Sequence, residues 1–231
     1  SADVARIIED DRVAGVTLTG SEGAGRAVGQ TAGKMIKPMV LELGGSDPFI
    51  VLASADVDEA AKVAATARLI NGGQSCIAAK RFIVHDAIYQ PWLQVFVEKM
   101  AAVKMGDPFD PAVQLGPQAR HDLRDELHDQ VVRSVAAGAT LVLGGELPEL
   151  PGAFYPPTVL TDVRKGMPAY SEEMFGPVAT VIRVSSEEEA IEVANDSMFG
   201  LGAAVFTADL ARGERIAAEW LEAGCCFVNA F

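Results

Sequence analysis

Short apolar runs alternate with amphipathic stretches along this chain, the pattern of an α/β protein. The runs are rich in β-branched residues, and the stretches between them repeat their apolar positions at helical spacing. Repeated strand–helix units predict a mostly parallel sheet with helices on both faces. The expected strands cover residues 13–19, 39–43, 48–52, 81–84, 140–143, 178–184, 202–206 and 224–228. The expected helices cover residues 1–10, 24–35, 57–69, 87–103, 118–137, 187–195 and 210–222.

Two of these helices have additional local signals. Asp56 can cap the helix at 57–69, in which the apolar residues fall on one stripe. In the helix at 87–103, Trp92, Phe96 and Met100 recur every fourth residue. Pro and Gly gather at 144–157, which predicts a long connection there.

Composition changes the picture mainly by exclusion. The 231 residues are 49% hydrophobic and 22% charged, as in a globular protein with a substantial core. The formal charge of −13 argues against a nucleic-acid partner, although Lys80-Arg81 or a helix N-terminus could hold an anion. No apolar run reaches the roughly eighteen residues that span a bilayer, so we expect no membrane partner and a cytoplasmic location.

The three cysteines have different surroundings. Cys225 and Cys226 lie in the apolar run 224–228, which predicts a buried strand with thiols as small hydrophobic side chains. Cys76 follows the polar, glycine-rich segment 71–75, which is unlike a core strand, and a loop-to-helix junction there would favour its thiolate. None of the three has a metal-ligand spacing, and no metal site is expected. The alternative for Cys76 is an ordinary buried thiol.

Glu42 is an unusual carboxylate because it stands in an apolar strand, close to its carboxyl end. It either faces a ligand crevice or points to water from an edge strand. A thiolate can attack a carbonyl carbon, and a separate carboxylate can activate the water that hydrolyses the resulting thioester. Cys76 and Glu42 together therefore predict covalent acyl-enzyme turnover.

Two further segments have a functional and a structural interpretation. The turn Gly20-Ser21 follows a strand and opens a helix, so it is either a phosphate site that includes Gly25 or an ordinary turn. Near Glu173 and Phe175, a carboxylate could accept bonds from sugar hydroxyls while the ring packs on a flat cofactor. The structural alternative is a helix end with a hydrophobic plug.

Four motifs, in their order and spacing, resemble those of the aldehyde dehydrogenase superfamily. They are Thr19-Gly20-Ser21, Glu42-Leu43-Gly44-Gly45, Gly73-Gln74-Ser75-Cys76 and Glu173-Met174-Phe175-Gly176-Pro177. Within the superfamily, residues 45–51, 78–84 and 115–127 look like those of bacterial NAD(P)-dependent succinate-semialdehyde dehydrogenases. The resemblance implies a catalytic domain at 45–231, preceded at 1–44 by the last strand-helix-strand part of a Rossmann-like cofactor domain.

The resemblance also implies roles for individual residues. Cys76 would be the nucleophile and Glu42 the general base in the oxidation of a small aldehyde with NAD or NADP. Glu173 would hold the nicotinamide ribose, and Phe175 would bound the ring. The phosphates would be received at Gly20, Ser21 and Gly25, and the nicotinamide pocket would be lined by Leu43 and Gly44. The whole protein would be a homo-oligomer, a dimer or tetramer.

The chain departs from the family pattern in several places. It has no counterpart of the upstream Asn that helps stabilise the oxyanion, which is commonly worth about 3 kcal/mol, so we expect the isolated 231 residues to be nearly inactive. Ile70 stands where some relatives have a carboxylate-binding Arg, and Ala78 where some have a redox-active Cys. The sequence does not decide between NAD and NADP. Succinate semialdehyde is the expected substrate, and another small aldehyde is the alternative.

Two other functions stay open at this point. The first is a cysteine hydrolase in which His85, His121 or His128 serves as the base, although none of these has a triad-like context. The second is a silent binding or structural protein on the same fold.

Overall fold

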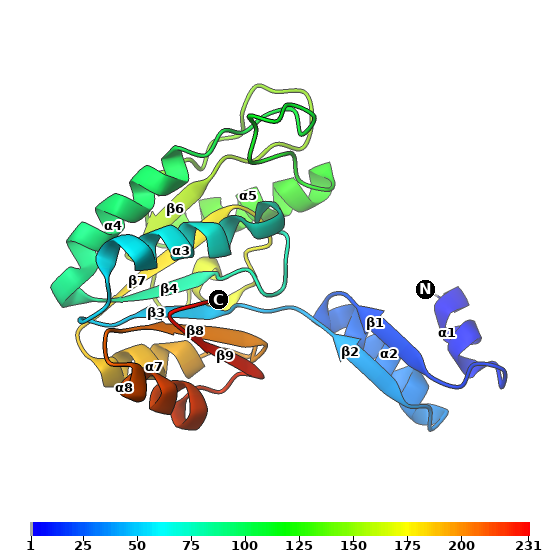
Figure 1. Ribbon diagram of the computed structural model, residues 1–231. Coiled ribbons are helices and arrows are strands. Elements are labelled where there is room, and N and C mark those ends of the chain that lie inside the picture. Colours follow the sequence, from blue (N-terminus) through cyan, green and yellow to red (C-terminus); the bar gives the residue numbers. More distant parts are fainter. Residues whose placement is uncertain (1) are drawn as a thin grey trace. The chain divides into compact units, whose positions relative to one another are not determined.

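The computed structural model describes residues 2–231 and divides into two compact units, Ser1–Gly44 and Gly45–Phe231 (Figure 1). The N-terminal unit contains α1 (Ala2–Glu9), β1 (Val16–Thr19), α2 (Glu22–Lys34) and β2 (Met39–Glu42). Strands β1 and β2 pair in parallel. A small core of Ile8, Val28 and Ala32 joins the helices to this pair of strands.

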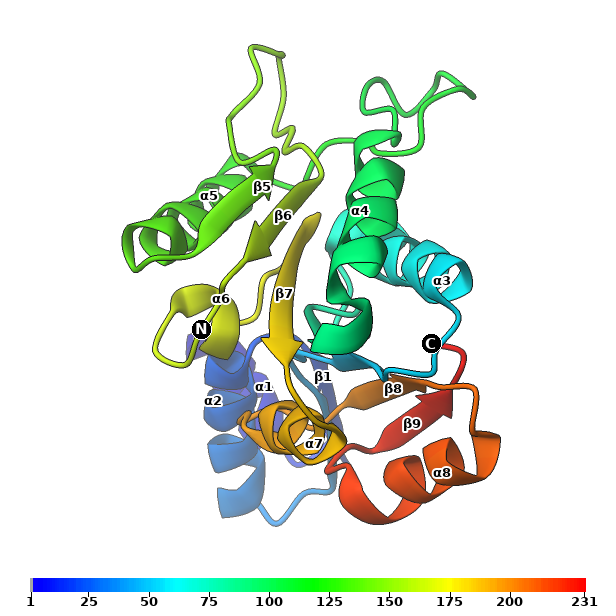
Figure 2. The ribbon, with the colours of Figure 1, turned by 90° about the vertical axis from the view of Figure 1, so that its left-hand side faces the viewer.

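The C-terminal unit is built on a seven-stranded sheet with the order β5-β6-β7-β4-β3-β8-β9. All neighbouring strands run parallel except β5 and β6, which are antiparallel. Figure 2 shows β5, β6 and β7 side by side. The strands are β3 (Pro48–Val51), β4 (Arg81–His85), β5 (Thr140–Leu143), β6 (Thr158–Thr161), β7 (Val178–Val184), β8 (Gly202–Phe206) and β9 (Cys225–Val228).

Helices cover both faces of this sheet, because its central strands are apolar on both sides. In β3, Phe49 and Val51 pack with α3 (Val57–Leu69) and α4 (Asp86–Ala101), whereas Ile50 belongs to the core of the opposite face. The opposite face carries α5 (His121–Ala136), α6 (Pro168–Ser171), α7 (Glu187–Asn195) and the π-helix Ile216–Trp220 that continues α8 (Leu210–Arg215).

The predicted α/β class and mostly parallel sheet are confirmed. The bounds of α3, α7, β5, β7 and β8 are the predicted ones, and Asp56 caps α3 by accepting a bond from the Glu59 amide. Strand β6 and the short α6 were not predicted. Among residues 2–231, no helix is long and apolar enough to span a membrane.

Several predicted helices are shorter in the structure, among them those expected at 118–137 and 210–222. The helix expected at 118–137 begins at His121, because the backbone amide of Gln118 is bonded to Ala153 O instead. The helix expected at 210–222 ends at Trp220. Its end is fixed by Asn195, whose side chain donates to Trp220 O and accepts from the Glu222 amide. A backbone bond to a distant segment thus lies at the first boundary, and the side chain of Asn195 from α7 fixes the second.

Candidate active site

The approach to Cys76 is a left-handed turn after α3. Asn71, Gly72 and Gly73 have φ values of 50°, 64° and 76°. A Cβ on Gly73 would lie 2.2 Å from Gly176 O, so this position has no room for a side chain. The glycines noted in the sequence therefore serve a tight reversal of the chain and a close contact between two backbone segments.

Side chains fix this turn from several directions. Fully buried Arg68, near the end of α3, donates to Gly73 O at 2.8 Å and to Val178 O at 3.3 Å. Burial lowers the pKa of Arg68 to about 9. On the other side, Gln74 accepts a bond of 2.8 Å from the Ala119 amide. The turn is thus bonded to β7 and to the segment before α5.

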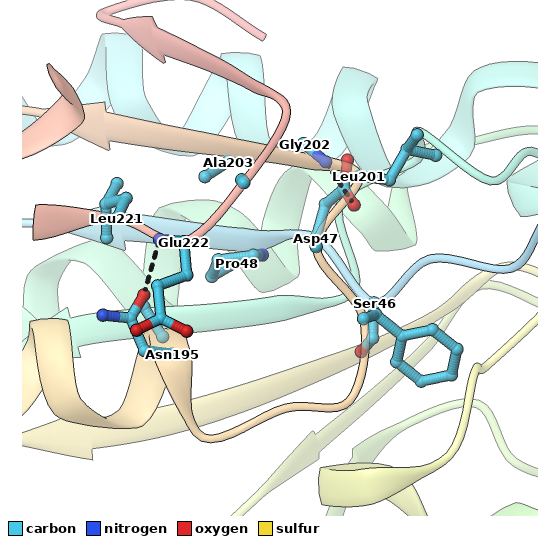
Figure 3. Close-up of a pocket in the computed structure, with 13 residues that line it drawn as sticks. Ser46, Asp47, Pro48, Asn195, Leu201, Gly202, Ala203, Leu221 and Glu222 are labelled. Carbon is cyan, nitrogen blue, oxygen red and sulfur yellow. Dashed lines mark hydrogen bonds between the residues drawn. The ribbon is translucent and has the colours of Figure 1, made fainter.

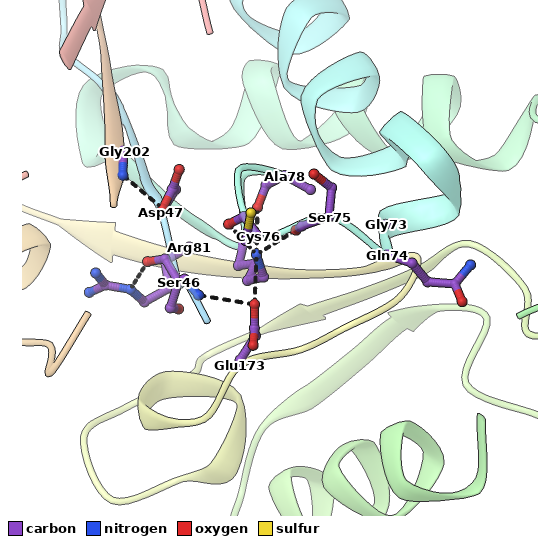
Figure 4. A network of polar contacts seen from close by, with 12 residues as sticks. Ser46, Asp47, Gly73, Gln74, Ser75, Cys76, Ala78, Arg81, Glu173 and Gly202 are labelled. Atoms are coloured by element: carbon purple, nitrogen blue, oxygen red, sulfur yellow. Dashed lines mark hydrogen bonds and ion pairs between the residues drawn. The ribbon is translucent and has the colours of Figure 1, made fainter. Parts of the chain in front are cut away.

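Cys76 lies in what we call the Cys76 loop, residues 74–79, between this turn and β4 (Figure 4). The thiol is free and half-buried. The predicted loop-to-helix junction is wrong, because the helical segment precedes the cysteine and a strand follows it. The chain leaves α3, passes through the loop and enters β4, so Cys76 does not stand at the N-terminus of a helix.

Lys80 lies under the Cys76 loop, with its side chain only 1% exposed. Its Nζ donates to Ser75 O, Cys76 O and Ala78 O, each at 3.0 Å. Burial, followed by the charge of Arg68, lowers the pKa of Lys80 to about 8, and Glu173 opposes this shift. Nζ lies 3.6 Å from Glu173 Oε1.

Glu173 connects a second segment to the same loop. Its Oε1 accepts a 3.0 Å bond from the Gly45 amide. A Cβ on Gly45 would lie 2.5 Å from Cys76 O, so the backbone at Gly45 touches the nucleophile segment directly. Within residues 2–231, Glu173 Oε1 accepts the bond from Gly45 and Oε2 accepts no hydrogen bond. Phe175, two residues further on, is 37% exposed.

The remaining predicted site residues belong to the N-terminal unit. Glu42 ends β2 with an exposed side chain, and its carbonyl accepts a 2.9 Å bond from the Gly20 amide. Ser21 is the N-cap of α2 and accepts from the Ala24 amide at 3.4 Å. A Cβ on Gly25 would lie 2.6 Å from the side chain of Leu43, which precedes Gly44. Glu42 and its neighbours therefore surround the turn from β1 to α2.

The site residues thus fall into two groups, one in each unit. Cys76, Glu173 and Phe175 belong to the C-terminal unit, where Lys80 links the first two. Glu42, Gly20, Ser21, Gly25, Leu43 and Gly44 belong to the N-terminal unit. The assignment of a common site to these two groups remains a prediction.

A small pocket lies beside the amino end of β3 (Figure 3). It is lined by Ser46, Asp47 and Leu201, among others, and Cys76 is not one of its lining residues. Asp47 accepts a 3.1 Å bond from the Gly202 amide, and burial raises its pKa. A Cβ on Gly202 would lie 2.3 Å from Asp47 Oδ2. Asp47 therefore fills the space between β3 and β8 and leaves little room for a ligand.

Lys80 and Arg81 do not form the surface anion site that the sequence allowed. Arg81 is buried and donates to Ser46 O, Val193 O and Ala194 O. Because Lys80 is bonded to three carbonyls in the same way, both cations stabilise loops within the fold. A Lys-Arg pair directly before an apolar strand was the only sequence signal for this role.

The prediction of buried thiols at Cys225 and Cys226 is also wrong. Strand β9 has the partly exposed pattern of a sheet edge among the described strands, with Cys225 exposed and Cys226 half-buried. Burial still raises the pKa of Cys226. An apolar run of this length does not reveal how many neighbours a strand has.

His85 and His128 have partners away from Cys76, and His121 is the first residue of α5. His85 caps α4 by accepting from the Ala87 amide at 3.2 Å, and His128 Nδ1 lies 3.3 Å from the Tyr155 hydroxyl. Among the described residues, no hydrogen bond joins Cys76 to a histidine. No observation thus favours a Cys-His hydrolase. Residues 2–231 contain no group of three or more His, Cys, Asp or Glu side chains that could hold a metal ion.

Comparisons with known proteins cover nearly the whole chain. The model of the aldehyde dehydrogenase family matches residues 2–231. A succinate-semialdehyde dehydrogenase [NADP(+)] of Mycobacterium avium is 57% identical over 229 residues, 99% of this chain and 48% of that protein. The chain spans about half the length of the curated relatives it matches.

Solved structures agree with this match. The succinic semialdehyde dehydrogenase of Streptococcus pyogenes, in complex with NADP+, superimposes with a TM-score of 0.96 at 43% identity, over 99% of this chain and 50% of that one. An aldehyde dehydrogenase of Mycobacterium tuberculosis, complexed with NAD+, gives a TM-score of 0.94 at 34% identity, over 97% and 47%.

Proposed function

Because this chain belongs to the aldehyde dehydrogenase family, we propose that the whole protein oxidises a small aldehyde to a carboxylic acid with NAD(P)+. The observation that carries the proposal is the environment of Cys76. A free, half-buried thiol stands in the Cys76 loop, whose backbone is bonded by a buried cation. Such a thiol is not enclosed in the core, and the backbone that carries it is held in place.

We assign the chemistry to Cys76 and Glu42. The Cys76 thiolate adds to the aldehyde carbon and gives a thiohemiacetal on sulfur. NAD(P)+, when bound, would supply the hydride acceptor. Loss of the hydride from the carbon and of the hydroxyl proton from the oxygen of the adduct leaves a thioester on Cys76. Glu42 then takes a proton from water, whose oxygen attacks the thioester carbon and releases the acid and the Cys76 thiol.

Two features of the chain fit a dinucleotide. Glu173 has one carboxylate oxygen, Oε2, that accepts no hydrogen bond from residues 2–231, and it is suited to accept from a ribose hydroxyl. The N-terminus of α2 follows Gly20-Ser21 directly after β1, a place where backbone amides favour a phosphate. We therefore propose Gly20, Ser21, Gly25, Leu43, Gly44, Glu173 and Phe175 as cofactor contacts, and residues 1–44 as part of the cofactor domain.

For the substrate we propose succinate semialdehyde in the whole protein. Support comes from the relatives at 52–57% identity, which carry that activity in their names together with NADP(+). Ile70 offers no charge to a distal carboxylate, so other residues must recognise it. Another small aldehyde remains the alternative.

The test is a panel of aldehydes assayed on the whole protein with NAD+ and with NADP+. We expect succinate semialdehyde with NADP+ to give the highest kcat/KM. Cys76→Ala should abolish NAD(P)H formation, and Cys225→Ala should leave it within twofold. Hydrolysis of a thioester without any nucleotide-dependent oxidation would reject the proposal in favour of a hydrolase.

A further inference from the structure

We propose that Lys80 is a positioning residue for Cys76, and that its ammonium group holds the Cys76 loop in its reactive shape. The proposal deepens the proposed function, because it rests on Cys76 being the nucleophile. Its geometry lies entirely within the C-terminal unit.

The first argument is a match between donors and acceptors. A lysine ammonium has three N–H donors, and Lys80 Nζ has three carbonyl acceptors at 3.0 Å, from Ser75, Cys76 and Ala78. A neutral amine has only two N–H donors and would release one carbonyl. The arrangement therefore requires the protonated side chain.

The second argument is that the bonded carbonyls define the nucleophile segment itself. The Ala78 amide closes a turn onto Ser75 O at 3.2 Å, and Lys80 bonds both ends of this turn. Cys76 O is bonded to Nζ and lies against the backbone of Gly45. With its carbonyl held in this way, the peptide of Cys76 cannot rotate freely, and the direction of its Cα–Cβ bond is set.

The third argument is the charge around Nζ. Arg68, a cation, opposes the charged form of Lys80. Glu173, Asp47 and Cys76 favour the ammonium. The pKa of Lys80, lowered to about 8 mainly by burial, leaves the ammonium as the main form at pH 7.

The compensation for burying this cation comes from the groups around Cys76. A buried lysine is costly unless paired, and Lys80 finds its partners in three carbonyls of the Cys76 loop and in Glu173. Replacing Lys80 by a neutral side chain would therefore release the loop that carries Cys76. Lys62, on the exposed side of α3, has no comparable setting and provides a matched control.

The test uses the 231-residue chain with Lys80→Met, and Lys62→Met as control. Rates of alkylation by iodoacetamide are measured at each cysteine by mass spectrometry from pH 6.5 to 9.5, and amide exchange is measured on the same proteins. In Lys80→Met we expect Cys76 to react at least threefold more slowly at pH 7, and the Ala78 amide to exchange at least tenfold faster. Cys225 and Cys226 should stay within twofold, and Lys62→Met should match the wild type at every site.

Unchanged Ala78 exchange, or Cys76 alkylation as fast as in the wild type, would overturn the proposal. If circular dichroism shows that Lys80→Met is unfolded, the wild type supplies the second measurement. Protection of the Ala78 amide should then fall as pH rises through about 8, while that of Ala60 in α3 persists. Protection of both amides to pH 9.5 would contradict the proposal.

Failure of this proposal and failure of the proposed function give different results. Neither alkylation nor exchange uses an aldehyde or a nucleotide, so both can support the role of Lys80 in a protein that oxidises nothing. Conversely, the whole protein could be an active dehydrogenase while Lys80→Met changes neither Cys76 alkylation nor Ala78 exchange. That result would support the proposed function and reject the positioning role of Lys80.

Discussion

Cys76 and Cys225 are both free thiols that solvent can reach, but their surroundings differ in kind. Cys225 lies on β9 at the edge of the sheet, where only strand pairing holds the backbone. Cys76 lies in a loop whose carbonyls are bonded to the buried ammonium of Lys80. Gly45 lies against the carbonyl of Cys76, and Gly73, just before the loop, lies against Gly176. Cys76 is the less exposed of the two residues, so exposure does not mark it as the nucleophile. What separates them is how firmly the surrounding backbone is held.

The largest expected effect comes from removing each of the two thiols and comparing the losses in activity. In the whole protein, Cys76→Ala should lower kcat by at least 1000-fold, about 4 kcal/mol in transition-state free energy. Cys225→Ala should change kcat by less than twofold, because β9 supplies only a sheet edge. NAD(P)H formation with succinate semialdehyde measures both. Equal losses in the two variants would remove the distinction between the thiols.

The next effect tests the turn that delivers Cys76. Gly73→Ala should lower the free energy of unfolding by about 3 to 4 kcal/mol, since its Cβ would lie 2.2 Å from Gly176 O at a φ of +76°. Urea denaturation monitored by circular dichroism measures the change. Gly116→Ala is the control, because its Cβ would meet Pro108 at an ordinary 3.6 Å. Wild-type stability in Gly73→Ala would show that the two loops can separate without cost.

A third effect concerns the cation under the loop. The pKa of Lys80 is lowered in the folded state from 10.5 to about 8, so between these values the unfolded chain binds the proton and the folded chain does not. Stability contributed by Lys80 is therefore constant below about pH 8 and rises between about pH 8 and 10.5, in total by roughly 3 kcal/mol. Lys80→Met should lack this rise.

Urea denaturation of wild type and Lys80→Met at intervals from pH 7 to 10.5 measures the difference. Subtracting one protein from the other removes the contributions of the remaining groups, including the tyrosines whose pKa values burial raises. A difference that stays constant with pH would mean that Lys80 titrates as it does in the unfolded chain.

The smallest expected effect lies at the other thiol. Cys225→Ser should change the free energy of unfolding by less than about 0.5 kcal/mol, because the side chain is exposed and no bond depends on it. Thermal and urea denaturation measure this value. A decrease of more than about 2 kcal/mol in the free energy of unfolding would instead indicate that Cys225 is buried, as the sequence predicted.

Much of the fold follows from local signals in the sequence. Helix α3 was predicted to the residue because Asp56 caps it and its alanines form one buried stripe. Strand β6 was missed because its four residues follow two prolines at the end of a long connection. The end of the last helix was missed because Asn195, more than twenty residues away in sequence, provides its terminal bonds.

The candidate site was predictable only in part. Cys76 and Glu173 stood out by residue type and setting, and the structure brings them to one network through Lys80. Lys80 itself could not be found, since a lysine before a strand gives no sign of being 1% exposed with three carbonyl partners. Whether Glu42 shares a site with Cys76 depends on long-range geometry that no local pattern contains.

The ion pair between Lys80 and Glu173 restricts how this loop can evolve or be transplanted. Removing either acidic neighbour, Glu173 or Asp47, leaves the cation with less compensation, so a single substitution meets a cost that a paired substitution avoids. Lys80, Asp47 and Glu173 should therefore covary among relatives. A designer who grafts the Cys76 loop onto another scaffold must transfer all three residues together, although they lie in three separate stretches of the chain.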